Sequence, residues 1–494
     1  MPSTKYYSRG LTAALLGVLS VYAYCTWQVL QGVLPVWDDE YSYFANARSF
    51  FENTTLRAAF TYTGEGSRLF HSDVHGFAYP LLNGLIAKVV GFHDINIPLT
   101  NLAFIPLAII LIFSQADLTS LQKMFIAFCL LSYPVVVLFT FTFMPESVHL
   151  FIAVCCAILL KNIYTTHDRR WIVAFIGVLL LASLFRNLWL FWSVALLPLA
   201  KTRKAFLFYV ALFLLLSSIS FLFVKLFWDP LPSPFSSMTI HVHNGNFKEA
   251  AGVFLGNTMR NLTMLVHAPW KRQPVLPYLA TDLFTIFLFG AMIFHFLKTK
   301  SRFSLAVILV CIVNIGLLLL LFKVMGWGEV RTMAPLYYLF IVFIAYHKER
   351  LPVIVTLIFL SVAGPSAVVK TRQWIHGRNS QASCLHNDKT QIAAYAGIAD
   401  VVATDKEVRI LLGYVPRDHS KVRILLPVKS HSGRSICYVN NCFRLNLPRD
   451  RFDYVLYQTP LPEPPPGLLP TVINKYFSLY RVTITENRTV PERN

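Results

Sequence analysis

Long runs of apolar residues, separated by short polar loops, dominate the first 370 residues of the chain. An apolar run of about 20 residues is long enough to cross a bilayer as a helix. The pattern predicts a polytopic α-helical membrane protein with about eleven spans. The runs that end at Leu160 and Ala200 are short for a span, so those segments could instead be tilted, re-entrant or merged with their neighbours. The runs are residues 11–30, 97–113, 124–143, 148–160, 171–185, 188–200, 205–227, 283–297, 303–322, 333–346 and 351–369.

Basic residues gather in alternate loops, which indicates how the spans are oriented. One set of loops carries Lys161 with Arg169, Lys201 with Arg203, and other bases, whereas the opposite loops begin with sequences such as WDDEY and FMPES. Loops rich in Lys and Arg stay in the cytoplasm. The N-terminus is therefore expected inside, and an odd number of spans puts the C-terminus outside.

Composition agrees with a membrane protein. The chain is 55% hydrophobic and only 14% charged, against about a quarter charged in soluble proteins. Its formal net charge of +19 would suggest a nucleic-acid partner in a soluble protein. Here the bases lie in short loops beside spans, where orientation in an anionic membrane explains them. No nucleic-acid-binding motif is present, so no nucleic-acid partner is expected.

Two long outer loops and a tail stand apart from the spans. Residues 35–95 form the first outer loop, with two amphipathic stretches, 41–51 and 76–90, that are typical of surface helices. Residues 228–282 form a second outer loop rich in Pro, His and Asn. Residues 371–494 alternate apolar and polar positions, which predicts a small extracytoplasmic α/β domain with strands near 408–415, 422–428, 452–458 and 476–485 and a helix over 390–402. Residues 1–370 are then the transmembrane domain.

Three consecutive acids, Asp38, Asp39 and Glu40, follow the first span. Like charges this close raise one another's pKa, so one of them could act as a base. Transfer of a sugar to a hydroxyl needs such a carboxylate to take the acceptor's proton. The alternative is that acids after a first span simply mark the outer side.

The segment WDDEYSYFANARSF resembles the first-loop signature of the GT-C class of membrane glycosyltransferases, Asp-Glu-x-x-Tyr-x-x-x-Ala. Asp39, Glu40, Tyr43 and Ala47 match it. The class includes the aminoarabinose transferases of lipid A and the protein O-mannosyltransferases, which use polyprenyl-phosphate sugars. The resemblance implies that Asp39 is the catalytic or acceptor-orienting carboxylate, with Asp38 as the alternative because the register is ambiguous. It also implies that Tyr43 and Glu40 belong to the site.

A second segment, HSDVHGFAYPLL, is similar to the class's His-Pro-Pro-Gly-Tyr-Pro-Leu-Leu, although the double proline is absent. The similarity implies substrate contacts from His75 and Tyr79. In the class, basic residues near this helix hold the phosphate of the lipid carrier, which makes Lys88 a candidate. The alternative for Lys88 is a surface lysine that extends along apolar neighbours.

Three charged residues at outer helix ends complete the candidate site. Glu146, in FMPES, resembles the Pro-Glu-x-Leu motif of the class and could line the site, although a helix dipole alone favours Glu there. His149 is expected to be a packing or capping residue. Arg186 and Arg331 break the positive-inside pattern, and relatives often have arginines there, so together they could clamp a lipid phosphate. The alternative is pairing with an outer carboxylate such as Glu329.

Other polar features have simpler interpretations. His241 and His243 could bind a metal with first-loop acids, but a solvated loop is favoured. No cofactor is predicted, and a divalent metal has no support in the sequence beyond these histidines. Three Asn-x-Ser/Thr triplets, at Asn53, Asn261 and Asn487, could be glycosylated in a eukaryote.

These features favour an inverting glycosyltransferase that moves a sugar from a polyprenyl-phosphate donor to a hydroxyl of a glycan, lipid or protein outside the cytoplasm. The nearest motifs are bacterial, which indicates an inner (plasma) membrane with the site facing the periplasm. One alternative is a transporter or flippase of lipid-linked sugars, but such proteins place ionisable groups within the membrane. Another is a scaffold whose tail binds a partner.

Overall fold

The computed structural model divides into two compact units. The helical unit contains Met1–Gln31, Pro98–Phe223 and Pro232–His376, and the mixed unit contains Gly32–Ile97, Val224–Leu231 and Gly377–Asn494. The structure describes residues 4–33, 35, 38–54, 56, 60–61, 76–227, 234–267, 275–321, 331, 333–348, 350–387, 410–413, 436–438, 454–457, 467–473 and 478–483.

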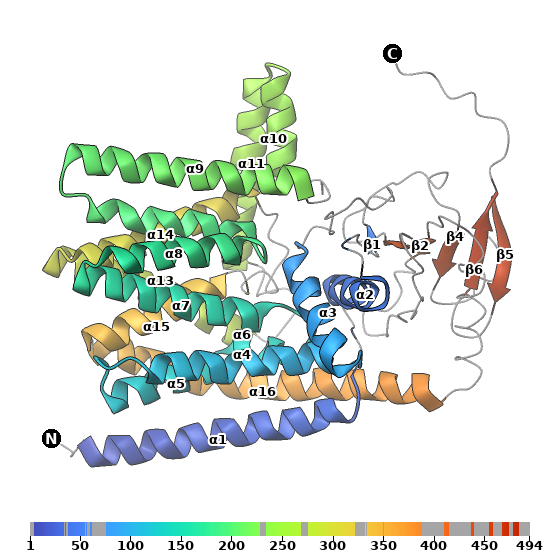
Figure 1. The fold of residues 1–494 in the computed structure, drawn as a ribbon, viewed down its shortest axis with the longest axis horizontal. Helices are drawn as coiled ribbons and strands as arrows, with labels where there is room; N and C mark the ends of the chain where they lie inside the picture. The colour runs from blue at the N-terminus through green and yellow to red at the C-terminus, as the bar shows by residue number, and fades with distance from the viewer. Residues whose placement is uncertain are drawn as a thin grey trace. The chain divides into compact units, whose positions relative to one another are not determined.

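Helices that run side by side build the helical unit (Figure 1). Every apolar run predicted from the sequence overlaps one or two of them. The elements are α1 (Thr4–Leu30), α4 (Asn96–Phe113), α5 (Ser120–Ser132), α6 (Pro134–Phe139), α7 (Glu146–Thr166), α8 (Arg169–Ser183), the 3-10 helix η1 (Asn187–Leu199), α9 (Arg203–Phe227), α10 (Pro234–His243), α11 (Phe247–His267), α13 (Val275–Thr299), α14 (Arg302–Leu321), α15 (Ala334–His347) and α16 (Arg350–Asn387).

Within the described residues, six helices are long and apolar enough to cross a membrane, and five shorter apolar helices accompany them. The prediction of a multi-pass helical membrane protein is therefore confirmed, while the number of about eleven spans stays a prediction. The six are Gly10–Leu30, Asn96–Phe113, Glu146–Thr166, Arg203–Leu226, Arg302–Leu319 and Arg350–His376.

Two predicted runs differ from plain α-helices. The run 124–143 is broken between α5 and α6, because Pro134 forces the preceding Tyr133 into an extended conformation (φ −66°, ψ 128°). The run 188–200 is a 3-10 helix of 13 residues. A 3-10 helix of that length is about 26 Å long, against about 20 Å for an α-helix. The tighter winding brings this short run closer to the bilayer core thickness of about 30 Å.

The polar turn between α5 and α7 is held by bonds from other helices. Thr371 Oγ1 donates to the Val137 carbonyl (3.0 Å), and Asn101 Nδ2 donates to the carbonyls of Thr142 (2.9 Å) and Met144 (2.7 Å). A backbone carbonyl without a partner is costly inside a membrane. These bonds fix the turn that leads into α7.

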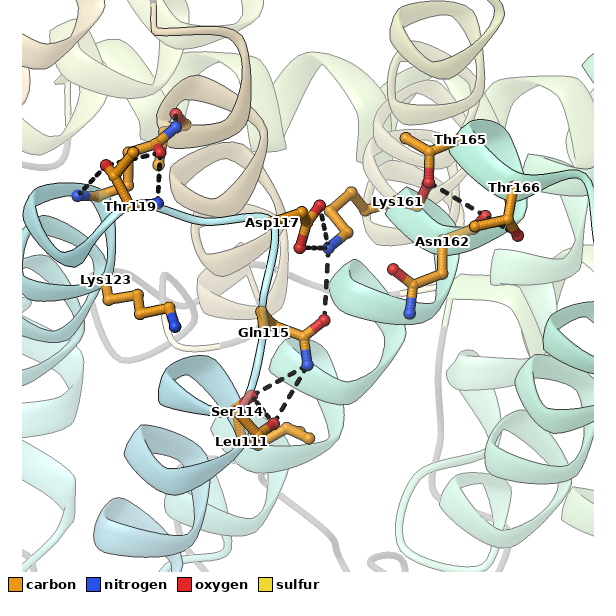
Figure 2. Close-up of polar contacts among 12 residues, drawn as sticks. Leu111, Ser114, Gln115, Asp117, Thr119, Lys123, Lys161, Asn162, Thr165 and Thr166 are labelled. Atoms are coloured by element: carbon orange, nitrogen blue, oxygen red, sulfur yellow. Dashed lines mark hydrogen bonds and ion pairs between the residues drawn. The ribbon is translucent and has the colours of Figure 1, made fainter.

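Figure 2 shows that the opposite end of α7 is tied to the α4–α5 loop. The Lys161 ammonium is bound by both carboxylate oxygens of Asp117, at 2.6 and 2.7 Å, and by Gln115 Oε1 at 3.3 Å. The sequence places Lys161 in a cytoplasmic loop, but α7 continues to Thr166 and the side chain is buried. Lys161 is therefore part of the packed structure and is not a free loop charge.

The second long outer loop, residues 228–282, contains the hairpin α10–α11. The hairpin runs across the direction of α9 and α14 (Figure 1). Asn257 and Asn261 of α11 donate to the carbonyl of Leu319 in α14, at 2.6 and 3.3 Å. Apolar side chains elsewhere on the hairpin are exposed, including Ile240, Phe247, Leu255 and Met259, a composition typical of helices that lie in a membrane interface.

Among the described residues, the mixed unit contains α2, α3 and the ends of α9 and α16 as well as a six-stranded sheet. Both predicted surface stretches are helical, as α2 (Asp38–Asn53) and α3 (Ala78–Val90). The strand order is β1-β3-β2-β4-β6-β5, parallel from β1 to β4 and antiparallel from β4 to β5. The strands are β1 (Phe60–Thr61), β2 (Ile410–Gly413), β3 (Ile436–Tyr438), β4 (Tyr454–Tyr457), β5 (Leu468–Ile473) and β6 (Ser478–Val482).

The sheet is only partly what the tail sequence predicts. Three predicted strands contain β2, β4 and β6, whereas β3 and β5 are not predicted. The predicted strand over 422–428 and helix over 390–402 lie outside the described residues. Because β1 belongs to the first outer loop and pairs with β3, the sheet is not made by the tail alone.

Candidate functional site

Glu146 begins α7, directly after the turn that Asn101 holds. Its side chain is only 4% exposed. A negative side chain in the first turn is favoured by the helix dipole. The helix dipole does not require the carboxylate to be buried. The role of Glu146 therefore depends on the side chains around it.

Arg186 and Arg331 converge on Glu146 from two other elements. Arg186 immediately precedes η1, and Arg331 lies three residues before α15 begins. Arg186 Nη2 is 3.9 Å and Arg331 Nε is 3.7 Å from Glu146 Oε1, and both arginine side chains are about four-fifths buried. The structure thus brings together the two predicted phosphate-binding arginines and the predicted site glutamate. Glu329, the alternative partner, lies outside the described residues.

This cation cluster, formed by Glu146, Arg186 and Arg331, brings two guanidiniums to one carboxylate. Both ion-pair distances exceed normal hydrogen-bond length. Neither carboxylate oxygen of Glu146 accepts a hydrogen bond from the part of the chain that the structure describes. The carboxylate therefore engages neither guanidinium tightly. Two mostly buried guanidiniums that meet at one point can bind an anion.

His149 lies one turn further along α7 and is buried. Its Nδ1 accepts a hydrogen bond of 3.1 Å from Nε1 of Trp189 in η1. The expectation of a packing residue fits this contact, whereas a cap is excluded because His149 is the fourth residue of the helix. Trp189 has no motif around it that would identify it from the sequence.

The three acids of the first loop open α2. Asp38 is its first residue, and the side chain of Asp38 lies outside the described residues. Asp39 is partly exposed, while Glu40 is fully buried. Negative charge in the first helical turn is favoured for all three. Of the two side chains that the structure describes, that of Asp39 is the one accessible to an acceptor.

Tyr43 and Tyr79 lie in the interface between α2 and α3. Their rings meet edge to face with centroids 5.0 Å apart, and both are buried. Gly84 in α3 permits α2 and α3 to approach closely, since a Cβ at Gly84 would lie 2.7 Å from Phe50 Cδ1 in α2. The two tyrosines therefore pack against each other and support α2, which carries Asp39.

Lys88 lies on the exposed side of α3. Its Nζ donates to Thr54 Oγ1 (2.9 Å) and lies 5.5 Å from the centroid of the Phe51 ring. These contacts fit the interpretation of a surface lysine, and the phosphate-binding role stays a prediction. His75 lies outside the described residues.

His241 and His243 are in the last turn of α10 rather than in a loop. Residues two apart on a helix point to nearly opposite sides, so the two rings cannot share one ion. The described residues contain no group of three or more His, Cys, Asp or Glu side chains placed to hold a metal.

Comparison with solved structures identifies the fold as that of the GT-C class of membrane glycosyltransferases, over most of the chain. ArnT from Cupriavidus metallidurans, bound to undecaprenyl phosphate, is 12% identical and matches with a TM-score of 0.50 over 97% of this chain and 98% of ArnT. The Archaeoglobus fulgidus oligosaccharyltransferase, in complex with Zn and sulfate, is 12% identical and matches with a TM-score of 0.50 over 91% of this chain and 67% of that enzyme.

The same archaeal enzyme tethered to an acceptor peptide is 10% identical and also matches with a TM-score of 0.50, over 92% of this chain and 69% of that one. No model of a protein family matches the sequence, and no curated protein matches it. At this level of identity the likeness establishes the fold alone.

Proposed function

We propose that this chain is an inverting glycosyltransferase that moves a sugar from a polyprenyl-phosphate donor to an acceptor hydroxyl. The observation that carries the proposal is the cation cluster, in which Arg186 and Arg331 share the single carboxylate of Glu146. Two mostly buried guanidiniums at the ends of membrane helices suit the phosphate of a lipid carrier. In the GT-C fold this chemistry belongs to a lipid-linked sugar donor.

The reaction removes a proton from the acceptor hydroxyl and leaves a second negative charge on the lipid phosphate. The acceptor oxygen attacks the anomeric carbon as the bond from that carbon to the phosphate oxygen breaks, with inversion. Asp39 takes the acceptor proton, and the released lipid phosphate gains a second negative charge. Arg186 and Arg331 stabilise that charge more than the single charge of the donor, which lowers the barrier.

A small cavity lies among α13, α14 and α15, and its lining includes Leu288, Ile315, Met333 and Phe340 together with Tyr133 and Tyr337. Its volume of about 20 Å³ suits a water molecule rather than an isoprenoid unit. The cavity therefore does not define a path for the lipid tail. Lys88 is the alternative phosphate ligand in the mixed unit.

The proposed acceptor is defined by its chemical class alone. It is a hydroxyl of a glycan, lipid or protein, reached on the outer face, and the predicted location is a bacterial inner membrane with the site towards the periplasm. Nucleotide sugars are largely cytoplasmic, which favours a lipid-linked donor on that side.

A transporter of lipid-linked sugars is the second candidate. The break at Tyr133–Pro134 and the 3-10 helix η1 favour it, because transporters often build binding sites from discontinuous helices. The charges of Glu146, Arg186 and Arg331 lie at helix ends rather than mid-span, which favours the transferase.

The test is glycan analysis in cells that lack the native gene and carry Asp39→Asn, Asp38→Asn, an Arg186→Gln and Arg331→Gln pair, or the wild type. Membrane levels are matched, and Arg169→Gln, an exposed arginine at the other end of the bundle, is the control. Loss of one sugar with Asp39→Asn and with the arginine pair, but not with Arg169→Gln, supports the transferase. If a lipid-linked sugar instead fails to cross the membrane while transfer is intact, the transporter is supported.

A further inference from the structure

The His149 ring has one satisfied and one unsatisfied nitrogen. The indole N–H of Trp189 can only donate, so Nδ1 of His149 must be the acceptor of their 3.1 Å bond. In the neutral ring the proton then resides on Nε2, which becomes a hydrogen-bond donor. Trp189 therefore fixes the tautomer.

The Nε2 atom is buried and has no hydrogen-bond partner among the described residues. Buried polar atoms in folded proteins nearly always have a partner, and a histidine of this kind, only 2% exposed, is not satisfied by bulk water. The two ring nitrogens point in different directions, so Nε2 faces away from Trp189. A ligand is the natural acceptor for its proton.

The position of His149 connects this donor to the cation cluster. His149 is three residues after Glu146 in α7, a spacing that puts both side chains on one face of the helix. Both Arg186 and Arg331 lie close enough to act electrostatically on its ring. Because Nδ1 accepts the bond from Trp189, it carries no proton, and the ring beside the two guanidiniums is the neutral tautomer with its proton on Nε2.

We propose that His149 is a ligand-binding residue whose Nε2 donates a hydrogen bond to a phosphate oxygen held by Arg186 and Arg331. The ligand class is a phosphate ester, and the inference rests on the proposed function because it assigns a third donor to the donor-phosphate site. Two guanidiniums supply charge, while His149 supplies a directed neutral donor. Trp189 acts as a positioning residue, since it holds the ring in the donating tautomer.

The experiment measures binding of undecaprenyl phosphate to the purified full chain in detergent micelles. His149→Asn places an amide near the position of Nδ1, so it can keep the Trp189 bond but loses the Nε2 donor. His149→Gln places an amide N–H near Nε2 and keeps the donor. We expect His149→Gln to bind within a few-fold of wild type and His149→Asn to bind roughly 10- to 100-fold more weakly, the range for a hydrogen bond to a charged group.

Two further ligands identify the source of the phosphate. Undecaprenol, which has no phosphate, should bind equally to wild type and His149→Asn. Inorganic phosphate as a competitor shows whether the site takes the anion alone or needs the lipid. Trp189→Phe, which leaves His149 in place but frees its tautomer, should weaken undecaprenyl phosphate binding by less than His149→Asn does.

Contrary results separate this inference from the proposed function. If Arg186→Gln and Arg331→Gln weaken binding but His149→Asn does not, or if His149→Gln loses as much as His149→Asn at equal thermal stability, the role of His149 is wrong and the donor site stands. If the arginine variants bind like wild type, the donor site itself is wrong. Should His149→Asn fail to fold, an unchanged affinity in Trp189→Phe together with lost affinity in His149→Gln overturns the inference.

Discussion

Lys161 Nζ lies 2.6 Å from Oδ1 of Asp117, yet the two partners are buried very differently (Figure 2). The lysine side chain is 1% exposed, and the aspartate side chain is 46% exposed. An exposed carboxylate can be solvated without its partner, whereas a buried ammonium cannot. The pair therefore serves to neutralise the lysine, and its two members should respond unequally to mutation.

Asp117→Asn should destabilise the protein more than Lys161→Met. The first change leaves an uncompensated buried ammonium and should cost about 2 kcal/mol, a figure reduced because Asp117 is half exposed. The second leaves a carboxylate that water can reach, with an apolar chain in the buried position, and should cost less than about 1 kcal/mol. Thermal unfolding of the detergent-solubilised protein, followed by tryptophan fluorescence, measures both.

The double variant is the control for this pair. Without the lysine, loss of Asp117 has little further effect, so the double variant should unfold near the Lys161→Met temperature. If Lys161→Met lowers the unfolding temperature as much as Asp117→Asn does, the ion pair itself stabilises the fold. The prediction of unequal losses of stability is then wrong.

Apolar run length predicts the helices well but not their ends or their kind. An apolar run ends where charges begin, which places Lys161 in a loop, although α7 continues for more than one turn beyond it to Thr166. The 3-10 winding of η1 also has no signature in composition, because α- and 3-10 helices can bury the same apolar residues. The hairpin α10–α11 was missed because its amphipathic pattern is interrupted by Asn, Gly and His.

Arg186 and Arg331 were found in the sequence because each breaks the positive-inside rule, a signal that needs no contact information. Their common partner could not be deduced in the same way. Glu146 is 185 residues from Arg331, the difference between their numbers, and only the packing of α7 with η1 and α15 brings the three together. Trp189 and the orphan nitrogen of His149 carry no sequence signal at all.

Gly84→Ala should weaken the contact between α2 and α3. A Cβ at Gly84 would lie 2.7 Å from Phe50 Cδ1 and 3.0 Å from the Ala47 carbonyl oxygen, and the backbone oxygen cannot move aside as a side chain can. Overpacking of this kind costs about 1–3 kcal/mol. Gly177→Ala in α8 is the matched control, since nothing lies within 4 Å of its Cβ and alanine is favoured in a helix by about 1 kcal/mol.

Unfolding temperatures of the two glycine variants decide this prediction. We expect Gly84→Ala to unfold at a lower temperature than wild type and Gly177→Ala at an equal or higher one. Because α2 carries Asp39, a shifted α2 should also lower any transferase activity. Equal behaviour of the two variants would mean that α2 and α3 adjust without cost.

Asn261 should not carry a glycan, although it stands in an Asn-Leu-Thr triplet. The side chain is fully buried, and its amide donates to the Leu319 carbonyl. An acceptor amide must be accessible to the glycosylating enzyme, and a glycan would break the contact between α11 and α14. In a glycosylating eukaryotic host, Asn261→Gln should have the same gel mobility as wild type both before and after glycosidase treatment. A mobility shift lost in Asn261→Gln alone would contradict the packing of α11.

Glu146→Gln should tighten phosphate binding while it destabilises the free protein. Glu146 is an ion-pair partner of both guanidiniums, and its removal takes one negative charge out of the cation cluster. Both arginines are mostly buried, so their repulsion is poorly screened. We expect undecaprenyl phosphate to bind on the order of tenfold more tightly, as a change of about 1.4 kcal/mol would give, and the ligand-free chain to unfold at a lower temperature.

The added ligand should restore more stability to Glu146→Gln than to wild type, because the anion takes the place of the missing carboxylate. Glu146→Asp, which keeps the charge, and Glu249→Gln, which removes an exposed acid from α11, should both bind like wild type. Weaker binding by Glu146→Gln would instead mean that the carboxylate orients the arginines or contacts the ligand directly. In that case its two oxygens, which accept no hydrogen bond in the described structure, would be acceptors for a hydroxyl of the sugar or of the acceptor.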